Sequence, residues 1–404
     1  MDARRYDIVI VGGGLVGASL ALSLSGQGWR IALVEAVSAE GTQPSFDGRL
    51  SALAAAAVSQ LDALGVWAPV AAQAAPIRRI HVSERGRYGC TRLDAGEENV
   101  PALGWVIANR VLGEALMARL TACADVERWC PYRFDAFEAD QDGCRVLRLQ
   151  PLEAGGEAVR LEAALVVGAD GAHSAVRDAL GIAAERHDYG QTAFMLRVRC
   201  EHPAQGVAWE RFTDSGPLAF LPMADGRYAV VWTVREAQVE ALRGLDDAAL
   251  LARLQDRFGW RVGRLLAVEG RESYPLIRVF SAQPTAGRAL VLGNAAHTLH
   301  PVAGQGFNLC LRDIRVLTDL LRRAHERGAD PGEASLLASY VEARCADYRR
   351  SLSATDTLAR LFLPDLPGLG ALRGVALALL DSCPPARHRL AQVAMGWVDV
   401  STPV

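Results

Sequence analysis

Near its start the chain reads Tyr6-Asp7-Ile8-Val9-Ile10-Val11-Gly12-Gly13-Gly14-Leu15-Val16-Gly17. The first six residues form a short apolar run rich in β-branched side chains, which is typical of a buried parallel strand. A helical apolar pattern begins directly after the glycines. Gly12 allows a tight turn, Gly14 allows a pyrophosphate to approach the backbone, and Gly17 allows the helix to pack on the strand. This strand, turn and helix together predict a dinucleotide site.

The helix start and the next strand supply further contacts that a dinucleotide needs. The free N–H groups at Leu15 and Val16 are expected to face the phosphates. Residues 30–34 form a second apolar strand, and Glu35 follows it. A carboxylate at this place can accept hydrogen bonds from ribose hydroxyls. The alternative is a Gly-rich turn without a ligand, which leaves the position of Glu35 unexplained.

Length and composition set wide limits on the class of protein. The chain has 404 residues, 50% of them hydrophobic, and a net charge of −3, so it can hold two domains and gives no reason to expect nucleic acid. No run of about 18 apolar residues occurs, so no transmembrane helix is predicted. Eight scattered cysteines without a CxxC pair predict reduced thiols in a cytoplasmic protein, and no His or Cys cluster argues for a metal. Arg4 and Arg5 precede an apolar stretch, but Asp7 and the glycines interrupt it, which disfavours a signal peptide.

The order of strand-like and helix-like segments predicts an α/β fold with insertions. The Ala-rich segment Leu50–Leu64 and residues 110–120 are expected to be helices, whereas residues 184–274 favour strands with a short helix at 248–258. We predict a Rossmann-like nucleotide-binding domain, an inserted β-sheet substrate domain and a helical C-terminal region. Their expected limits are 1–75, 102–183 and 275–340 for the first, 76–101 and 184–274 for the second, and 341–404 for the third.

Two later Gly-containing turns each follow a predicted strand. They are Val167-Gly168-Ala169-Asp170-Gly171-Ala172-His173-Ser174 and Gly293-Asn294-Ala295-Ala296-His297. With the first turn, they resemble the para-hydroxybenzoate-hydroxylase-like group of FAD-dependent aromatic monooxygenases over nearly the whole chain. The resemblance implies that the first turn binds the FAD pyrophosphate, that Asp170 and Gly171 touch FAD and the nicotinamide cofactor, and that Gly293 and Asn294 hold the ribityl chain. Asp170 and Asn294 could instead cap helices.

The same resemblance implies a reaction. NAD(P)H would reduce FAD, O₂ would add at flavin C4a, and the hydroperoxide would transfer an OH group to an electron-rich phenol. Local strings look like the ubiquinone-biosynthesis branch, namely Phe46–Arg49, His81–Gly86, Glu210–Thr213, Gly216–Ala219 and Gly293–Asn308. Asn294, where Asp is usual, is similar to the 2-polyprenyl-6-methoxyphenol hydroxylases. A hydroxylase of a small soluble aromatic and a non-catalytic flavin-binding scaffold are the alternatives.

The small-residue loop Pro301–Gln305, which leads into a predicted helix, completes the expected site. A helix N-terminus at this loop would stabilise the negative charge of reduced flavin. His297 or His300 could act as a general base, or either could be structural. Arg49 and Arg110 could pair with phosphate or ribityl oxygens, or lie at the surface. The expected flavin-facing residues are His297, Pro301, Gly304 and Gln305. The expected cofactor-binding residues are Gly12, Gly14, Leu15, Val16, Gly17, Glu35, Arg49, Arg110, Asp170, Gly171, Gly293, Asn294, Gly304, Gly306, Phe307 and Asn308.

The resemblance also bears on partners. A polyprenyl phenol is insoluble in water, so the enzyme would need contact with a membrane face or with a delivering protein of a biosynthetic complex. Residues 361–397 combine apolar and basic side chains and could form an interfacial helix. A helix packed on the protein's own core is the alternative. Prolines divide the segment into short pieces in either arrangement, at positions Pro364, Pro367, Pro384 and Pro385.

Overall fold

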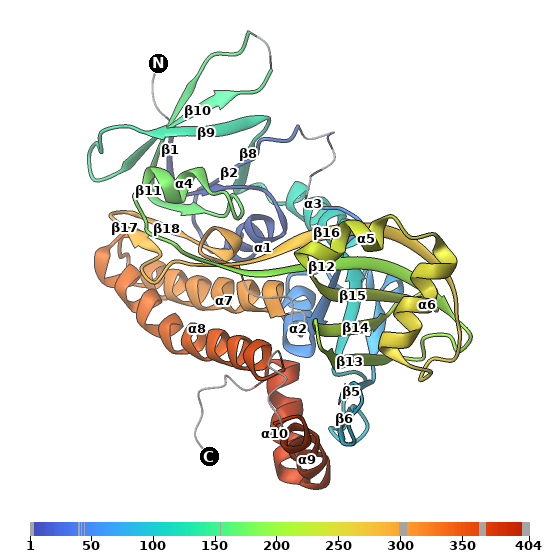
Figure 1. The fold of residues 1–404 in the computed structure, drawn as a ribbon. Helices are drawn as coiled ribbons and strands as arrows, with labels where there is room; N and C mark the ends of the chain where they lie inside the picture. Colours follow the sequence, from blue (N-terminus) through green and yellow to red (C-terminus); the bar gives the residue numbers. More distant parts are fainter. Residues whose placement is uncertain are drawn as a thin grey trace.

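The computed structural model describes residues 4–38, 41, 43, 45–153, 155–298, 305–362 and 369–397. Its described strands form three sheets, and its helices lie mainly beneath and beside them (Figure 1). Helix α1 (Leu15–Leu24) follows the first strand, and α7 (Gln305–Glu326) packs against it. The predicted α/β fold with an inserted sheet and C-terminal helices is confirmed.

The first sheet carries the nucleotide-binding turn. Its central strands run parallel, and apolar side chains bury both of its faces, as parallel sheets require. Its strands lie in the order β17 (Thr285–Ala286), β18 (Ala289–Val291), β11 (Val159–Gly168), β1 (Arg4–Val11), β2 (Ile31–Val34) and β8 (Val126–Trp129). The antiparallel strands β10 (Arg145–Pro151) and β9 (Tyr132–Phe137) extend from β11.

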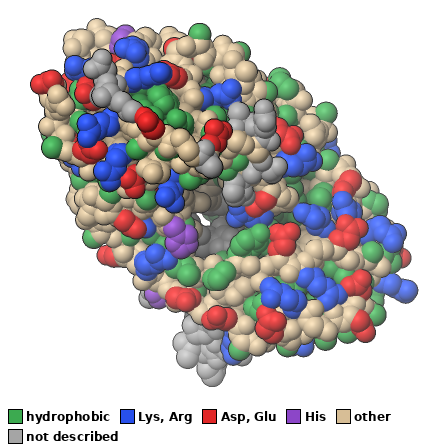
Figure 2. Space-filling model, turned by 90° about the horizontal axis from the view of Figure 1, so that it is seen from above, with side chains coloured by type: hydrophobic (Ala, Val, Ile, Leu, Met, Phe, Trp, Pro, Cys, Tyr) green, Lys and Arg blue, Asp and Glu red, His purple; other side chains and the backbone are tan. Residues whose placement is uncertain are grey.

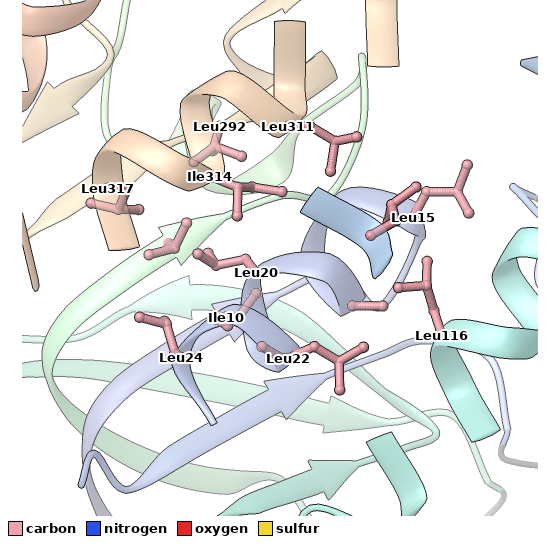
Figure 3. Packing of buried hydrophobic residues seen from close by; sticks show 14 of the residues in the cluster. Ile10, Leu15, Leu20, Leu22, Leu24, Leu116, Leu292, Leu311, Ile314 and Leu317 are labelled. Carbon is pink, nitrogen blue, oxygen red and sulfur yellow. The ribbon is translucent and has the colours of Figure 1, made fainter. Parts of the chain in front are cut away.

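One apolar cluster joins this sheet to its helices. Figure 3 shows Leu311, Ile314 and Leu317 of α7 lying close to α1 residues such as Leu20. Helix α3 (Asn109–Thr121) contributes Leu116 to the same cluster. All five side chains are almost fully buried. The core therefore fixes α1, and with it the first glycine turn, against the last part of the nucleotide domain.

The second sheet is antiparallel apart from one strand pair, and α6 (Asp247–Phe258) covers one of its faces. Its strands lie in the order β19 (His297–Thr298), β16 (Leu265–Phe280), β12 (Glu185–Cys200), β15 (Tyr228–Arg235), β14 (Gly216–Pro222), β13 (Val207–Thr213), β5 (Arg79–Glu84) and β6 (Cys90–Asp94). Strand β16 runs across the predicted domain limit at residue 275. The exact domain limits stay a prediction.

The small third sheet differs from the sequence prediction. It contains β3 (Leu50–Ala54), β7 (Gly104–Ala108) and β4 (Ala75–Ile77). The predicted helix over Leu50–Leu64 is therefore wrong in its first third, since α2 begins only at Ala55 and ends at Ala63. Residues 50–54 instead pair with β7, a contact between segments far apart in the chain.

The remaining helices include the C-terminal ones. They are α4 (Ala175–Ala179), α5 (Val239–Arg243), α8 (Ala334–Phe362), α9 (Leu369–Ser382) and α10 (Pro384–Met395). Helix α9 is tied to the second sheet by a buried ion pair in which Arg373 donates to the carboxylate of Glu84 at 2.5 and 3.1 Å. Nearby, Arg92 of β6 donates to Asp381 at 2.7 Å. Among the described helices none is long and apolar enough to cross a membrane.

Candidate functional site

Two glycines of the first turn have no room for a side chain. Gly12 adopts φ +105°, and a Cβ on it would lie 2.5 Å from the carbonyl oxygen of Ala169. A Cβ on Gly17 would lie 1.8 Å from the carbonyl oxygen of Gly12. Glycine is therefore required at both places, because β1, α1 and the end of β11 meet there backbone to backbone.

The start of α1 is open for an anion. Gly14 is the N-cap residue, no side chain caps the helix, and its first turn holds no acidic residue. The first intrahelical bond is donated by the Ala18 N–H, which leaves the preceding N–H groups, including those of Leu15 and Val16, to a ligand. Beside Gly14, the buried Ser45 hydroxyl has no hydrogen-bond partner in the described chain. This donor set fits a pyrophosphate, and Ser45 is a residue that no sequence motif indicated.

The Glu35 carboxylate is held beside the first turn by two backbone N–H groups. Its Oε2 accepts the Gly13 N–H at 2.6 Å and its Oε1 accepts the Val37 N–H at 2.8 Å. Each carboxylate oxygen can accept a further hydrogen bond, which suits a ribose diol. Glu35 lines a pocket of about 380 Å³ together with apolar residues that include Leu33, Phe46 and Met117. An adenosine fits this pocket in size and in chemistry.

The middle turn is held by its own hydrogen bonds. The Ser174 hydroxyl donates to Asp170 Oδ1 at 2.5 Å, and the Val176 N–H donates to Oδ2 at 3.1 Å. Ser174, not Asp170, is the N-cap residue of α4, since its Oγ accepts the Arg177 N–H. Asp170 thus orders the turn, and a direct contact of Asp170 or Gly171 with a cofactor stays a prediction.

The late turn packs directly on the first one. Gly293 adopts φ +64°, and a Cβ on it would lie 2.9 Å from Val16 Cγ1. Asn294 is exposed although Gly293 and Ala295 on either side are buried, and its amide makes no hydrogen bond with the described residues. It lies in a short 3₁₀ turn, so it does not cap a long helix. The Asn294 amide is therefore available to a ligand.

The two predicted arginines lie in different surroundings. Arg49 donates from Nε to Asp47 at 2.6 Å and lies over the ring of Tyr274 in the second sheet. Arg110 is 60% exposed and pairs with Glu114 at 3.0 Å. The structure places Arg49 between the nucleotide domain and the second sheet, and Arg110 at the surface. Their roles toward a cofactor stay predictions.

Part of the predicted flavin-facing loop falls outside the described residues, namely His300, Pro301 and Gly304. Gln305 begins α7, and Gly306 has open space around its Cα. Asn308 accepts the Ala54 N–H and donates to the Ala52 carbonyl, both at 2.9 Å. The Asn308 side chain thus binds α7 to β3, while Phe307 packs partly buried on the apolar cluster of α1 and α7.

His297 is part of a buried ion-pair network. It is 2% exposed, and its Nε2 lies 2.6 Å from Asp313 Oδ2. Arg344 donates to the other oxygen of Asp313 at 2.7 Å and also pairs with Asp347. Such a buried network holds elements in fixed positions, here the late turn, α7 and α8. An acid or base role for His297 stays a prediction.

The face of the second sheet opposite α6, called the inner face below, holds an accessible row of side chains. The row runs across five strands in register and consists of Met195, Val231, Ala219, Glu210 and Val82. All five are partly exposed, whereas Phe212 and Ala208 on either side of Glu210 are buried. Figure 2 shows that the surface is hollowed between the two lobes of the molecule. The row offers an apolar wall with one carboxyl group.

These features define a flavoprotein. The chain belongs to the FAD binding domain family, which it matches over residues 5–354. FAD is its cofactor, and the open helix start, the Ser45 hydroxyl and the Glu35 pocket fit the pyrophosphate and adenosine of that group. Within the described residues, no cluster of three or more His, Cys, Asp or Glu side chains could hold a metal.

Two relatives extend over nearly the whole chain. Ubiquinone hydroxylase UbiL of Rhodospirillum rubrum is 36% identical over 391 residues, which cover 96% of this chain and 89% of the relative. The 3-demethoxyubiquinol 3-hydroxylase of Escherichia coli is 35% identical over 402 residues, which cover 98% of this chain and all of the relative. The predicted resemblance to FAD monooxygenases of the ubiquinone branch is confirmed.

Solved structures share the fold. The p-nitrophenol 4-monooxygenase PnpA of Pseudomonas putida DLL-E4 superposes with a TM-score of 0.77 at 19% identity, over 97% of this chain and 98% of that one. PqsL of Pseudomonas aeruginosa gives a TM-score of 0.74 at 24% identity, over 93% of this chain and 99% of that one.

Proposed function

We propose that this protein hydroxylates a polyprenylated methoxyphenol in ubiquinone biosynthesis, with NAD(P)H as electron donor and O₂ as oxygen source. Support comes from two relatives, one named a ubiquinone hydroxylase and the other a 3-demethoxyubiquinol 3-hydroxylase, which align with the chain over almost its full length. Bound FAD would pass electrons from NAD(P)H to O₂, so that one oxygen atom of O₂ can be transferred to the substrate. The protein provides binding, orientation and exclusion of water.

The observation that carries the proposal is the accessible row on the second sheet. Its four apolar side chains can contact an aromatic ring and the start of a prenyl chain, and Glu210 can meet the phenol hydroxyl. At one end of the row, Met195 also lines a small pocket of about 20 Å³ with Arg49. Arg49 belongs to the segment beside the first turn, so the Met195 end of the row adjoins the nucleotide domain.

A lipid-soluble substrate also requires delivery. We extend the proposal to contact of the C-terminal helices with a membrane surface or with a protein of a biosynthetic complex. Val375 and Leu379 of α9 are exposed, and Tyr88 at the tip of the β5–β6 hairpin is 99% exposed. The Gly89 and Gly374 backbones touch, which brings the hairpin tip and α9 together. Exposed apolar side chains of this kind suit a lipid or protein surface.

The test uses purified, FAD-loaded protein and two substrates. One is a short-chain 2-prenyl-6-methoxyphenol, and the other is a short-chain 3-demethoxyubiquinol, chosen after the second relative. Consumption of NADH and NADPH is followed under ¹⁸O₂, with mass analysis of the products. A methoxyphenol product carrying one ¹⁸O is expected. Labelled product from the demethoxyquinol alone would overturn the substrate assignment, and flavin-bound protein without any oxygenated product would favour a scaffold.

A further inference from the structure

Glu210 points to the inner side of the second sheet. Side chains alternate between the two faces of a strand, and its neighbours Trp209 and Arg211 both contact α6 on the outer side. The Trp209 ring lies 6.1 Å from that of Phe258, and Arg211 Nε donates to the carbonyl of Arg257. Glu210 must therefore face the opposite way, toward the nucleotide domain. On this side its neighbour Ala208 belongs to the apolar cluster against which Leu50 and Ala52 of β3 pack.

The Glu210 carboxyl has no partner in the part of the chain that the structure describes. Among the described residues none donates a hydrogen bond to it or forms an ion pair with it. The side chains beside it in the row are Ala219 and Val82, both apolar. Burial raises the pKa of the Glu210 carboxyl to about 7. A lone carboxyl in such surroundings costs free energy, because nothing compensates for its lost hydration.

Glu210 is within the reach of a substrate that lies along the row. Three strand spacings of roughly 4.8 Å separate Met195 from Glu210, which places them about 14 Å apart. A phenol with the first isoprene unit of its chain is of similar length. The carboxyl is the one group among the five row residues that can accept a hydrogen bond from a hydroxyl.

Resting on the function proposed above, we propose that Glu210 is a catalytic residue that accepts the hydrogen bond and then the proton of the substrate's phenol hydroxyl. As the new C–O bond forms on the ring, the O–O bond of the O₂-derived oxygen donor breaks. The phenol O–H bond also breaks, and its electron pair moves into the ring. The proton passes to a carboxylate oxygen of Glu210. It returns to the substrate oxygen when the hydroxylated carbon releases its hydrogen as a proton, which the second oxygen atom of O₂ takes up on its way to water, and aromaticity is restored. The oxygen atom and the reducing equivalents come from O₂ and NAD(P)H through FAD.

The first experiment measures kcat/KM for oxygenated product from 2-methoxy-6-(3-methylbut-2-enyl)phenol between pH 5.5 and 9. The FAD-loaded wild type is compared with Glu210→Gln, Glu210→Asp and the control Glu240→Gln, whose carboxylate is 80% exposed on α5. In the wild type, kcat/KM should fall as one group is protonated on the acid side. Glu210→Gln should lose this pH dependence and roughly 10²- to 10⁴-fold of kcat/KM, the usual contribution of a general base. Glu210→Asp should keep the pH dependence at reduced rate, and Glu240→Gln should match the wild type.

A second measurement needs no turnover. Dissociation constants of the phenol and of its methyl ether are measured by the change in flavin absorbance. At pH 8 the wild type should prefer the phenol by roughly 10- to 100-fold, since hydrogen bonds to charged groups are strong. Glu210→Gln should lose most of this preference, which a purely structural role would leave unchanged.

The outcomes separate this inference from the proposed function. A wild type that makes no oxygenated product from any phenol overturns the function, and the inference with it. A wild type that makes product while Glu210→Gln keeps the rate, the pH dependence and the preference for the phenol overturns the inference alone. If Glu210→Gln does not retain FAD, Glu210→Asp decides, because loss of its acid-side pH dependence would contradict the role of the carboxylate.

Discussion

The Nε2 atom of His297 lies 2.6 Å from Oδ2 of Asp313, and both side chains are almost completely buried. Arg344 donates to the same carboxylate from α8. The pair therefore connects the turn that carries Asn294 to two long helices. Because the turn also packs on Val16, the position of Asn294 relative to the first glycine turn depends on this network.

Replacing Asp313 by Asn should destabilise the fold by about 3–5 kcal/mol, the usual cost of leaving buried charges unpaired. Burial would raise the pKa of Asp313, but the charges of His297 and Arg344 outweigh it, so the pKa lies below its ordinary 3.8. A carboxyl group whose pKa is lowered on folding stabilises the fold at pH values above its ordinary pKa. This stabilisation is lost as the pH falls through the lowered pKa. The free energies of unfolding of the wild type and of Asp313→Asn, measured with denaturant, should thus differ at pH 7 and become similar at acid pH. The exposed Asp319→Asn on the same helix is the control, and an equal loss there would contradict the argument.

The Gly17→Ala variant should fail to hold FAD. Its Cβ would lie 1.8 Å from the Gly12 carbonyl oxygen, so the turn must open. We expect a loss of about 3 kcal/mol or more in the free energy of unfolding. The measurements are FAD content after purification and thermal unfolding. Gly244→Ala is the control, because a Cβ there has its nearest contact at 3.4 Å. A Gly17→Ala protein with full FAD content would show that the turn can rearrange.

Glu35→Gln should weaken FAD binding without unfolding the protein. An amide can place only one acceptor oxygen where the carboxylate now accepts two backbone N–H groups and would accept the ribose hydroxyls. The expected loss is roughly 10- to 100-fold in the dissociation constant of FAD, measured by titration of apoprotein. Glu326→Gln removes an exposed carboxylate on α7 and should bind FAD as the wild type does. Equal affinities for all three proteins would argue against a ribose at Glu35.

Glu210 should make the stability of the protein depend on pH in the opposite sense to Asp313. Its raised pKa means that the folded state holds the proton more tightly than the unfolded state does. The free energy of unfolding is therefore greatest at pH values below 4.5, the ordinary pKa of a Glu carboxyl, and it decreases as the pH rises from there to about 7. The loss is at most on the order of 3 kcal/mol. Unfolding curves of Glu210→Gln should lack this decrease, and parallel curves for the two proteins would contradict it.

The strand–turn–helix–strand unit at the start of the chain could be predicted from sequence because it is local. Gly12, Gly17 and Glu35 lie in one strand–helix–strand unit, where spacing determines position. The segment Leu50–Ala54 could not be predicted, because its Ala and Leu residues favour a helix. Pairing with β7 and the hydrogen bonds of Asn308 make it a strand. Both partners lie far away in the chain, beyond the reach of local propensity.

The accessible position of the Glu210 carboxyl could not be predicted from the sequence either. A strand pattern shows that its side chains alternate, but it does not show which face stays accessible once two domains meet. The string Glu210–Thr213 contributed only to the family resemblance. The registers of five strands were needed to show that the Glu210 carboxyl lies in a row of apolar side chains. Ser45 gave no sequence signal either, since a lone serine in a loop is unremarkable until its hydroxyl is found buried beside Gly14.

The ion pair between Glu84 and Arg373 has a consequence for how the protein is made. The two residues are separated by 289 positions, so the ribosome completes the strand that carries Glu84 long before it reaches the arginine. During that interval the carboxylate must stay hydrated, and the edge of the second sheet formed by β5 and β6 lacks the helix that covers it. Domains generally fold as units during synthesis, yet this edge can close only after α9 has emerged. The substrate domain is thus completed by a helix that is translated long after most of its own strands.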